Sequence, residues 1–460
     1  MTPTESKQCS GRALQTRLLE PIDVAWLVAL RILLGVLLAV SMQRFLAYGW
    51  VDEFLVRPAF HFKYWGFVWV EPLGSSAMQA LFYALLVLSL AVAVGAFFRV
   101  TAPLLALGLT YVQLIDVSTY LNHYYLAALL TWLLAASPAH RAWSVDAWRK
   151  GRNVTTAPRG WQWLFRVQVG VVYFFAGLGK LQLDWLQDAQ PLRIWLGQST
   201  SLPLVGPLLT IEGLPLVLSW CGFLFDTTIV GWLSWKRTRP YAYFVLFVFH
   251  LFTRLLFDIG MFPFIMSAAA LVFFSPSWPR ALIGHWLEPA TREKPRAAGL
   301  LGRSALWLGA IYCAVQLVLP LRHFAYGGNV LWHEQGMRFS WRVMVRAKGG
   351  STTFLVRDPQ TGIEQEVSTR GYLTPLQQNE MAGQPDLILQ MAHAIGADLA
   401  QRRGHTVEVR AETRVSLNGR RAVPLIDPVV DLTQIRDGFG PYSWVLPAPT
   451  QAAPHTRPVL

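Results

Sequence analysis

The run Val171-Val172-Tyr173-Phe174-Phe175-Ala176-Gly177-Leu178-Gly179-Lys180-Leu181-Gln182-Leu183-Asp184-Trp185 places one lysine at the end of an apolar segment. The apolar residues extend from 161 to 181, which is long enough for a helix to cross a bilayer. An ammonium in hydrocarbon costs several kcal/mol unless it is neutral, paired or hydrated. Lys180 is therefore a candidate functional residue. The alternative is that its side chain only extends to the membrane surface, as interfacial lysines do.

The chain as a whole has the composition of a membrane protein. Of its 460 residues, 53% are hydrophobic and 15% are charged, and the mean hydropathy is +0.35. We predict a polytopic α-helical membrane protein with about nine spans, since spans need roughly 17 to 25 apolar residues. The nine runs are 24–45, 76–97, 101–119, 120–137, 161–181, 213–233, 240–257, 258–275 and 304–320. The third and fourth runs abut, as do the seventh and eighth, which predicts tight hairpins or re-entrant elements.

Basic residues cluster in the loops after the fourth, sixth and eighth runs. All three loops lie on one side if the N-terminus is cytoplasmic, as positively charged loops require. The net charge of +13 is then explained by topology, and we do not expect nucleic acid as a partner. The predicted units are a cytoplasmic tail at 1–23, a membrane domain at 24–320, an extracytoplasmic α+β domain at 321–446 and a disordered tail at 447–460.

The region after residue 320 has a different pattern from the rest. Strand-like stretches occur at 339–345, 353–357, 365–368 and 406–417. The dipeptide Asn418-Gly419 is typical of a hairpin turn, and residues 386–402 predict an amphipathic helix. The three cysteines show no paired spacing, so we expect no disulfide framework and no metal site.

The predicted topology brings distant polar residues to one side of the membrane. The fourth run begins at Asn122-His123 and the fifth ends at Lys180, so His123 and Lys180 are expected at a similar depth near the external face. The tip that carries Arg254 and Asp258 belongs to the same side. We expect these residues to converge on one external cavity. The alternatives are that His123 is an ordinary interfacial residue and that Arg254 and Asp258 form an internal ion pair.

Four further polar residues lie within the predicted spans and are candidates for the wall of this cavity. Arg31 lies in the first span, and Arg166, Gln168 and Tyr173 lie in the fifth. The alternative for the two arginines is that they are buried structural cations. The small Gly177 and Gly179 are expected to leave room for a flat ring beside the helix.

Several segments, in order along nearly the whole chain, resemble vitamin K-dependent gamma-glutamyl carboxylase. The most specific is 166–185, which ends in Gly177-Leu178-Gly179-Lys180-Leu181 and Asp184-Trp185. The others are 122–126 (NHYYL), 142–146 (AWSVD), 249–250 (FH), 259–262 (IGMF), 275–280 (SPSWPR), 319–324 (LPLRHF), 340–345 (SWRVMV) and 427–431 (DPVVD). The resemblance is more specific than membership of the broader horizontally transferred transmembrane (HTTM) domain group.

The resemblance implies a membrane enzyme that oxidises a reduced naphthoquinone, vitamin K hydroquinone or menaquinol, with O2. In that family a lysine at the place of Lys180 deprotonates the hydroquinone, and the anion reacts with O2 to give a stronger base. That base removes a γ-proton from a peptide glutamate, the carbanion takes up CO2, and the quinone leaves as its epoxide. The histidine that matches His123 serves the carbanion end, with Asn122 beside it. Hydrocarbon around Lys180 favours the neutral amine and excludes water that would quench the base.

The resemblance also implies a bacterial-type enzyme of the inner membrane that draws on the quinone pool and acts on a glutamate-containing exported peptide. One departure is Gly179, which stands where vertebrate members have the first of two adjacent lysines. Two alternatives stay open. One is a quinol epoxidase or oxidase, or a carboxylase of a small carbon acid. The other is a non-catalytic transporter or lipid-binding scaffold in which Lys180 and Arg254 bind an anionic headgroup.

Overall fold

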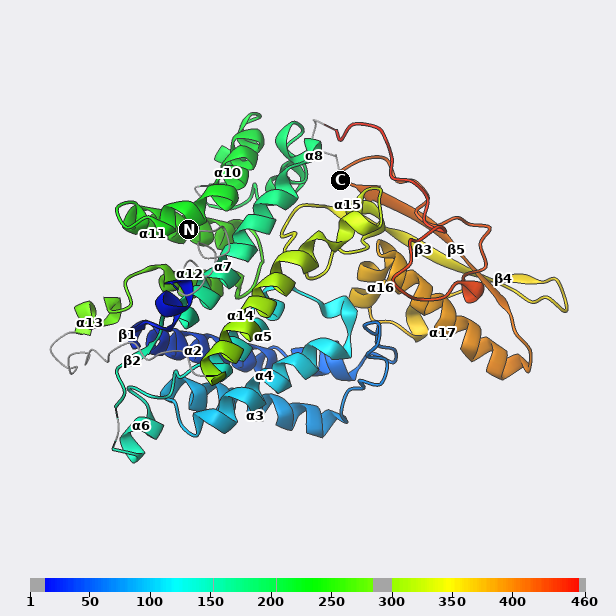
Figure 1. The fold of residues 1–460 in the computed structure, drawn as a ribbon. Coiled ribbons are helices and arrows are strands. Elements are labelled where there is room, and N and C mark those ends of the chain that lie inside the picture. Colours follow the sequence, from blue (N-terminus) through cyan, green and yellow to red (C-terminus); the bar gives the residue numbers. More distant parts are fainter. Residues whose placement is uncertain (1–12, 152, 204, 284–299, 455–460) are drawn as a thin grey trace, which may run out of the picture.

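The membrane part of the protein is a bundle of α-helices. The computed structural model describes residues 13–151, 153–203, 205–283 and 300–454, and each predicted apolar run contains a helix (Figure 1). These helices are α2 (Ala25–Ala47), α3 (Ser75–Val94), α4 (Phe98–Ile115), α5 (Asn122–Ala136), α7 (Arg159–Lys180), α10 (Leu214–Ser234), α11 (Arg239–Leu256), α12 (Phe262–Ala270) and α14 (Leu300–Val318).

Five helices in the described part of the chain are long and apolar enough to cross a membrane. They are Ala25–Ala47, Ser75–Val94, Phe98–Ile115, Leu214–Ser234 and Gly302–Ala325. The protein is thus a helical membrane protein, and the count of nine spans stays a prediction. Helix α5 has 15 residues and α12 has 9, so each is shorter than the roughly 20 residues that a full span needs.

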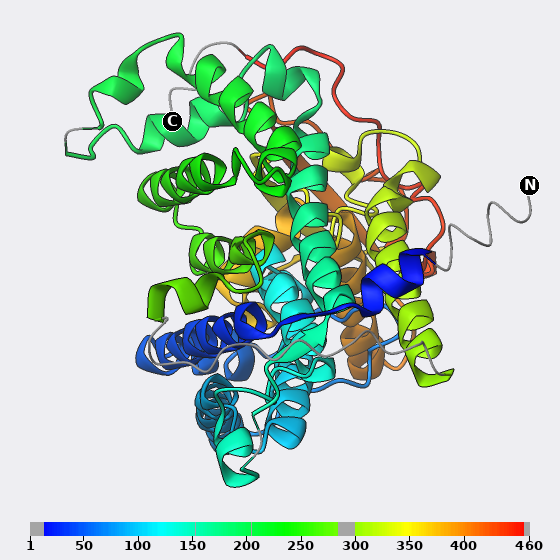
Figure 2. The same ribbon diagram turned by 60° about the vertical axis from the view of Figure 1, so that its left-hand side comes forward.

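Helix α7 occupies the middle of the bundle. It packs against α10 on one side and α14 on another, and it also contacts α12 and α5. Figure 2 shows α7 between the α10 to α12 group and α14. A two-stranded ribbon joins β1 (Pro21–Asp23) to β2 (Thr156–Pro158), which directly precedes α7. Short helices connect the longer ones: α6 (Val145–Arg149), α8 (Leu183–Leu186), α9 (Leu192–Gln198) and α13 (Trp278–Ile283).

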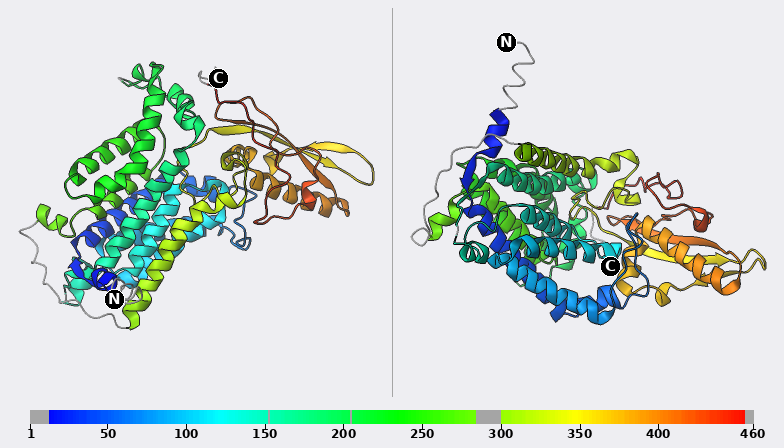
Figure 3. Two further views of the ribbon diagram at one scale, coloured as in Figure 1. Left: turned by 45° about the horizontal axis from the view of Figure 1, so that its top comes forward. Right: turned by 60° about the horizontal axis from the view of Figure 1, so that its bottom comes forward.

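The C-terminal region forms a three-stranded antiparallel sheet in the order β4-β3-β5. The elements are α15 (Val330–His333), β3 (Lys348–Arg357), β4 (Glu364–Val367), α16 (Pro375–Ala382), α17 (Pro385–Arg403) and β5 (Glu408–Leu417). Helix α17 packs on the sheet, and both project to one side of the helical bundle (Figure 3). The buried side chains of Phe354, Val356, Leu387 and Val409 form the core between them.

One predicted strand is wrong. Residues 339–345 form turns, because Phe339, Trp341 and Met344 all have positive φ angles that a strand does not allow. This irregular segment passes over the end of α7, where Val345 O accepts a hydrogen bond from Gln182 Nε2 at 3.2 Å. The segment is therefore part of the boundary between the two regions.

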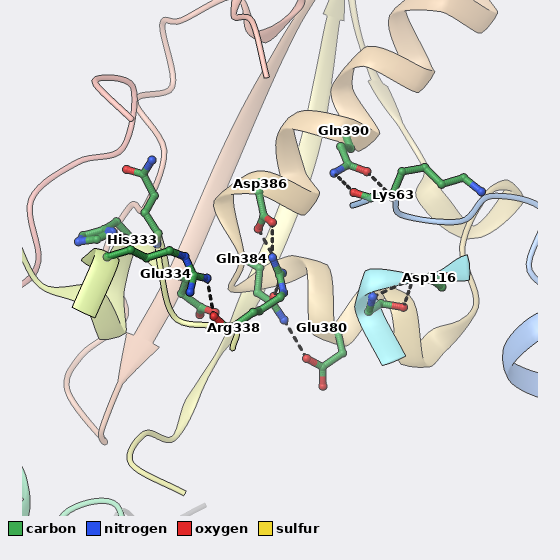
Figure 4. Close-up of polar contacts among 12 residues, drawn as sticks. Lys63, Asp116, His333, Glu334, Arg338, Glu380, Gln384, Asp386 and Gln390 are labelled. Atoms are coloured by element: carbon green, nitrogen blue, oxygen red, sulfur yellow. Dashed lines mark hydrogen bonds and ion pairs between the residues drawn. The ribbon is translucent and has the colours of Figure 1, made fainter. Parts of the chain in front are cut away.

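Side-chain amides fasten the C-terminal region to the membrane bundle. Gln390 pairs with the backbone of Lys63 through two hydrogen bonds of 2.8 and 2.9 Å, and Gln377 Nε2 donates to Asp116 at 2.8 Å. Figure 4 shows the Gln390 contact beside the ion pair of Arg338 with Asp386. Amides with several partners at fixed distances hold the two regions in one orientation.

A bidentate ion pair links the C-terminal region to α8, the short helix that follows α7. Arg420, just after β5, donates to both carboxylate oxygens of Asp184 at 2.6 and 2.7 Å, and Asn418 adds a bond of 2.7 Å. Burial would raise the pKa of Asp184, but the hydrogen bonds from Arg420 and Asn418 outweigh it and hold that pKa below its ordinary value. The end of α7 is thereby fixed against the C-terminal region.

The last described residues also pack on the protein. Within the segment predicted to be disordered, Ala453 is buried, and Pro454 O accepts a hydrogen bond from Gln190 at 2.8 Å. Arg420 Nε donates to Gln451 O at 2.7 Å. Residues 455–460 lie outside the described part.

Candidate functional site

A cavity of about 930 Å³, open space at its mouth included, lies beside the end of α7. Helices α7, α10 and α11 form its walls, and residues Val343 and Met344 of the C-terminal region close one end. Its lining is mainly aromatic and aliphatic, with Trp185, Trp195 and Phe262 among the larger side chains. The polar side chains that line it are few: Tyr173, Lys180, Asp226, His250 and Thr253.

Lys180 forms a buried ion pair with Asp226 of α10. The Nζ to Oδ2 distance is 2.7 Å, and each side chain is 8% exposed. The amine also lies 3.3 Å from Ala176 O and 3.5 Å from Val343 O, and 5.2 Å from the centre of the Trp185 ring. A proton can therefore pass between Lys180 and Asp226 without water, and both groups face the cavity.

The pair exists because α7 and α10 approach closely at Gly177. A Cβ added at Gly177 would lie 2.6 Å from Thr227 Cγ2 and 2.9 Å from the Thr227 backbone nitrogen. The expectation that Gly177 and Gly179 make room for a flat ring is therefore wrong. Gly177 faces the backbone of α10, and Gly179 faces Arg342 and Val345 of the C-terminal region.

Gly177→Ala should therefore separate α7 from α10 and lengthen the contact between Lys180 and Asp226. We expect the activity of the protein to fall about tenfold or more, with a destabilisation of about 1–3 kcal/mol from overpacking. The matched control is Gly170→Ala on the same helix, where an added Cβ would lie 3.5 Å from Val230 Cγ1, an ordinary contact. Enzyme assays and thermal unfolding of the two variants test this, and equal behaviour of both would contradict it.

A second polar pair lies deeper in the same cavity. The hydroxyl of Tyr173 on α7 lies 2.7 Å from Nε2 of His250 on α11, and both side chains are buried. Tyr173 was a candidate from the sequence, whereas His250 appeared only within a family motif. The rings of Phe249, Phe225 and Phe262 surround the imidazole.

His123 does not line this cavity, contrary to the expectation that it shares it with Lys180. The turn between α11 and α12 intervenes: Ile259 and Phe262 line the cavity, while an added Cβ at Gly260 would lie 3.5 Å from His123 Nε2. The His123 imidazole makes no hydrogen bond to any residue that the structure describes. The start of α5 and the end of α7 nevertheless both contact the segment 339–345. Phe339 N donates to the hydroxyl of Tyr120, just before α5, and Lys180 Nζ lies 3.5 Å from Val343 O.

The two candidate arginines bind backbone carbonyls and lie outside the cavity wall. Arg31 donates to the carbonyls of Ala93, Ala139, Ala142 and Trp143. Arg166 in turn donates to carbonyls of residues 272–274. Both arginines donate hydrogen bonds to backbone carbonyls inside the bundle. They therefore fit the alternative hypothesis that they are buried structural cations.

The remaining candidates are also away from the cavity. Gln168 accepts a hydrogen bond from Tyr312 of α14, and Asn122 accepts one from Tyr120 at 3.0 Å. Arg254 and Asp258 form an ion pair at 4.0 Å, with Asp258 93% exposed, so this pair faces outward. None of these residues is brought next to Lys180.

Asp226 escaped the sequence analysis, and His250 and Arg342 appeared there only within segments that resemble the family. Asp226 had a usable signal, because an acidic residue in the middle of an apolar span is a functional candidate. Arg342 lies against Gly179, and its NH2 is 2.8 Å from His323 Nε2. It makes no ion pair with any carboxylate in residues 13–454 as far as the structure describes them.

Two family models match the chain, one after the other. Residues 19–278, more than half of the chain, match the HTTM domain. Residues 302–451 match the lumenal domain of vitamin K-dependent gamma-carboxylase. No solved structure matches the chain. The junction between the two matches falls before α14, and the cavity is formed by residues from both.

Proposed function

Because the chain belongs to the vitamin K-dependent gamma-glutamyl carboxylase family, we propose that it carboxylates glutamate in an exported peptide at the expense of a reduced naphthoquinone. The observation that supports this most is the Lys180 and Asp226 pair at the wall of an apolar cavity. A base in a site without water is what the deprotonation of a quinol in a membrane requires.

The cavity suits a flat, apolar bicyclic ring. Its walls are aromatic and aliphatic, and Lys180 and Asp226 form a charged group at one place in them. Leu218 and the exposed Cys221 of α10 also line it, so the cavity reaches the outer surface of the bundle. When bound, vitamin K hydroquinone or menaquinol would supply the reaction with O2 that generates the strong base.

Lys180 and Asp226 together accept the quinol proton. If the pair is ionised, the ammonium passes a proton to Asp226 while Lys180 takes up the quinol proton. If the pair is neutral, Lys180 takes up the proton directly. Both routes end with an ammonium next to the new anion and a protonated Asp226, so the charge is balanced at the reacting oxygen. Val343 and Met344 cover this end of the cavity and exclude water.

The glutamate end of the reaction lies on the other side of the turn between α11 and α12, where His123 is located. His123 is 7% exposed and is available as a base or acid because it makes no hydrogen bond within the described chain. Arg342 is a cation without a carboxylate partner there and lies beside Gly179. We assign it to the carboxylate of the substrate, which Arg binds in a bidentate manner.

The topology that we propose rests on the apolar runs and loop charges of the sequence. Nine spans with a cytoplasmic N-terminus place Lys180, His123 and the C-terminal α+β domain on the external side of the inner membrane. The C-terminal domain then meets exported peptides as they leave the membrane. CO2 and O2 reach the site without a dedicated protein path because both dissolve in the bilayer.

Co-expression with secreted glutamate-containing peptides tests the proposal. Mass spectrometry should show a gain of one CO2 on glutamate that requires reduced quinone and O2, and extraction of the membranes should yield quinone epoxide. Epoxide without any carboxylated peptide would favour the quinol epoxidase. If neither carboxylated peptide nor quinone epoxide formed, the proposal that the protein is an enzyme of this kind would be refuted.

A further inference from the structure

His250 carries a polar atom for which the protein offers no partner. The side chain is 2% exposed and lines the cavity, and its Nδ1 has no hydrogen-bond partner. A buried donor or acceptor without a partner costs free energy, and native proteins seldom keep one without a reason. Because His250 lines the cavity, a ligand bound there would explain why its Nδ1 has no partner within the protein.

The neighbouring tyrosine determines which ring nitrogen bears the proton. Within the described chain, the Tyr173 hydroxyl has one acceptor in reach, His250 Nε2 at 2.7 Å. A buried hydroxyl donates where it can, so Tyr173 donates and Nε2 accepts. The hydrogen of the neutral imidazole is then on Nδ1. Tyr173 therefore holds His250, whose side chain lines the cavity, in the tautomer with its hydrogen on the unpartnered Nδ1.

We propose that His250 Nδ1–H donates a hydrogen bond to the second oxygen of the bound quinone ring, the one that does not face Lys180. This inference rests on the proposed function, since it takes the ring to lie in this cavity. A 1,4-quinone has an oxygen at each end of its ring. Among the polar groups of the cavity wall, we assign the Lys180 and Asp226 pair to the first oxygen and His250, fixed by Tyr173, to the second.

The assignment accounts for the position of a donor among aromatic rings. Phe249 and Phe262 lie with their ring centres 5.6 and 6.1 Å from the imidazole, and both line the cavity, where they offer contact to the flat faces of a ligand. They offer no acceptor to Nδ1. The site therefore selects ligands with two opposed oxygens over ring systems with one, because only the former satisfies both polar groups.

Menadione, 2-methyl-1,4-naphthoquinone, tests the inference with the purified full-length protein. Trp185 and Trp195 line the cavity, so binding can be followed by quenching of tryptophan fluorescence. Infrared spectroscopy of the bound quinone reports each carbonyl, since a hydrogen bond lowers its stretching frequency. We expect both carbonyl bands of menadione to be lowered in the wild-type protein.

Two isosteric variants separate the two ring nitrogens. The amide of His250→Asn lies where Nδ1 was, and that of His250→Gln lies where Nε2 was. We expect His250→Gln to bind menadione about tenfold more weakly and to return one carbonyl band to its value in hydrocarbon solvent. His250→Asn should keep the lowered band and bind within about threefold of the wild type. Tyr173→Phe, which no longer fixes the tautomer, should fall between them.

The outcomes distinguish this inference from the proposed function. If the wild-type protein binds menadione and His250→Gln shows the same affinity and the same two bands, the inference is wrong while the proposed function stands. If His250→Asn and His250→Gln lost the same affinity for menadione and kept both carbonyl bands at their wild-type frequencies, His250 would have a purely structural role and the inference would be wrong. If the wild-type protein does not bind menadione at all, the quinone site itself is wrong.

Discussion

Replacing Lys180 with methionine is expected to lower carboxylation by about 10³-fold or more, because the cavity then lacks the amine that takes the quinol proton and that leaves an ammonium beside the new anion. Lys180→Arg should be equally inactive. Arginine keeps the positive charge but stays protonated, so it cannot act as a base. Peptide carboxylation and epoxide formation, measured in parallel in purified membranes, check both variants.

The control for this prediction is Lys236→Met, an exposed lysine in the loop after α10, which should leave activity unchanged. The transporter or scaffold hypothesis makes the opposite prediction for Lys180→Arg. If that variant kept its function, charge alone would be sufficient at this position and the proton-accepting role would be refuted.

Replacing Asp226 with leucine is expected to lower the free energy of unfolding by about 3–5 kcal/mol, because Lys180 then stays buried without its carboxylate. Lys180→Met leaves Asp226 buried alone and should cost a similar amount. The double variant Lys180→Met/Asp226→Leu replaces the whole pair with apolar side chains. It should recover most of the lost stability but none of the activity.

Thermal unfolding in detergent checks this cycle, and the outward-facing pair of Arg254 and Asp258 provides the control. Its contact distance is 4.0 Å and it is largely exposed, so Arg254→Met/Asp258→Leu should change stability little. If the Lys180 and Asp226 variants proved additive, with no recovery in the double variant, the two side chains would not form the pair that the structure shows.

Hydropathy predicted where the helices of the bundle lie in the described part of the chain, while the count of nine spans stays a prediction. Each apolar run contains a helix because backbone groups in hydrocarbon must be hydrogen-bonded within the helix itself. Lys180 could be predicted for a related reason, since a cation at the end of an apolar run is costly and needs a purpose. These conclusions depend only on residues that are adjacent in the sequence.

The partners of Lys180 could not be predicted in the same way. Whether α10 presents Asp226 to Lys180 depends on how the two helices cross, and that crossing is set by the contact of Gly177 with Thr227. Nothing in one sequence fixes such a register between distant helices. The same limit explains why His123 was expected in the cavity, since similar depth does not place two residues on one side of the turn at Gly260.

The arginines show a different limit. Arg31 and Lys180 are both cations in apolar runs, yet Arg31 is satisfied by four backbone carbonyls and Lys180 by a carboxylate. A guanidinium has five donors and can satisfy several carbonyls at a helix end, whereas an ammonium cannot span them. The residue type alone therefore favours a structural role for a buried arginine more than for a buried lysine.

The most direct test of the central claim is the incorporation of labelled CO2 into a glutamate-containing peptide by purified wild-type protein, supplied with reduced menaquinone and O2. The account predicts label in a second carboxyl group bonded to the γ-carbon of glutamate, with formation of quinone epoxide, and loss of both in Lys180→Met. Label that appeared at an undiminished rate in Lys180→Met, or epoxide formation that did not depend on Lys180, would contradict it.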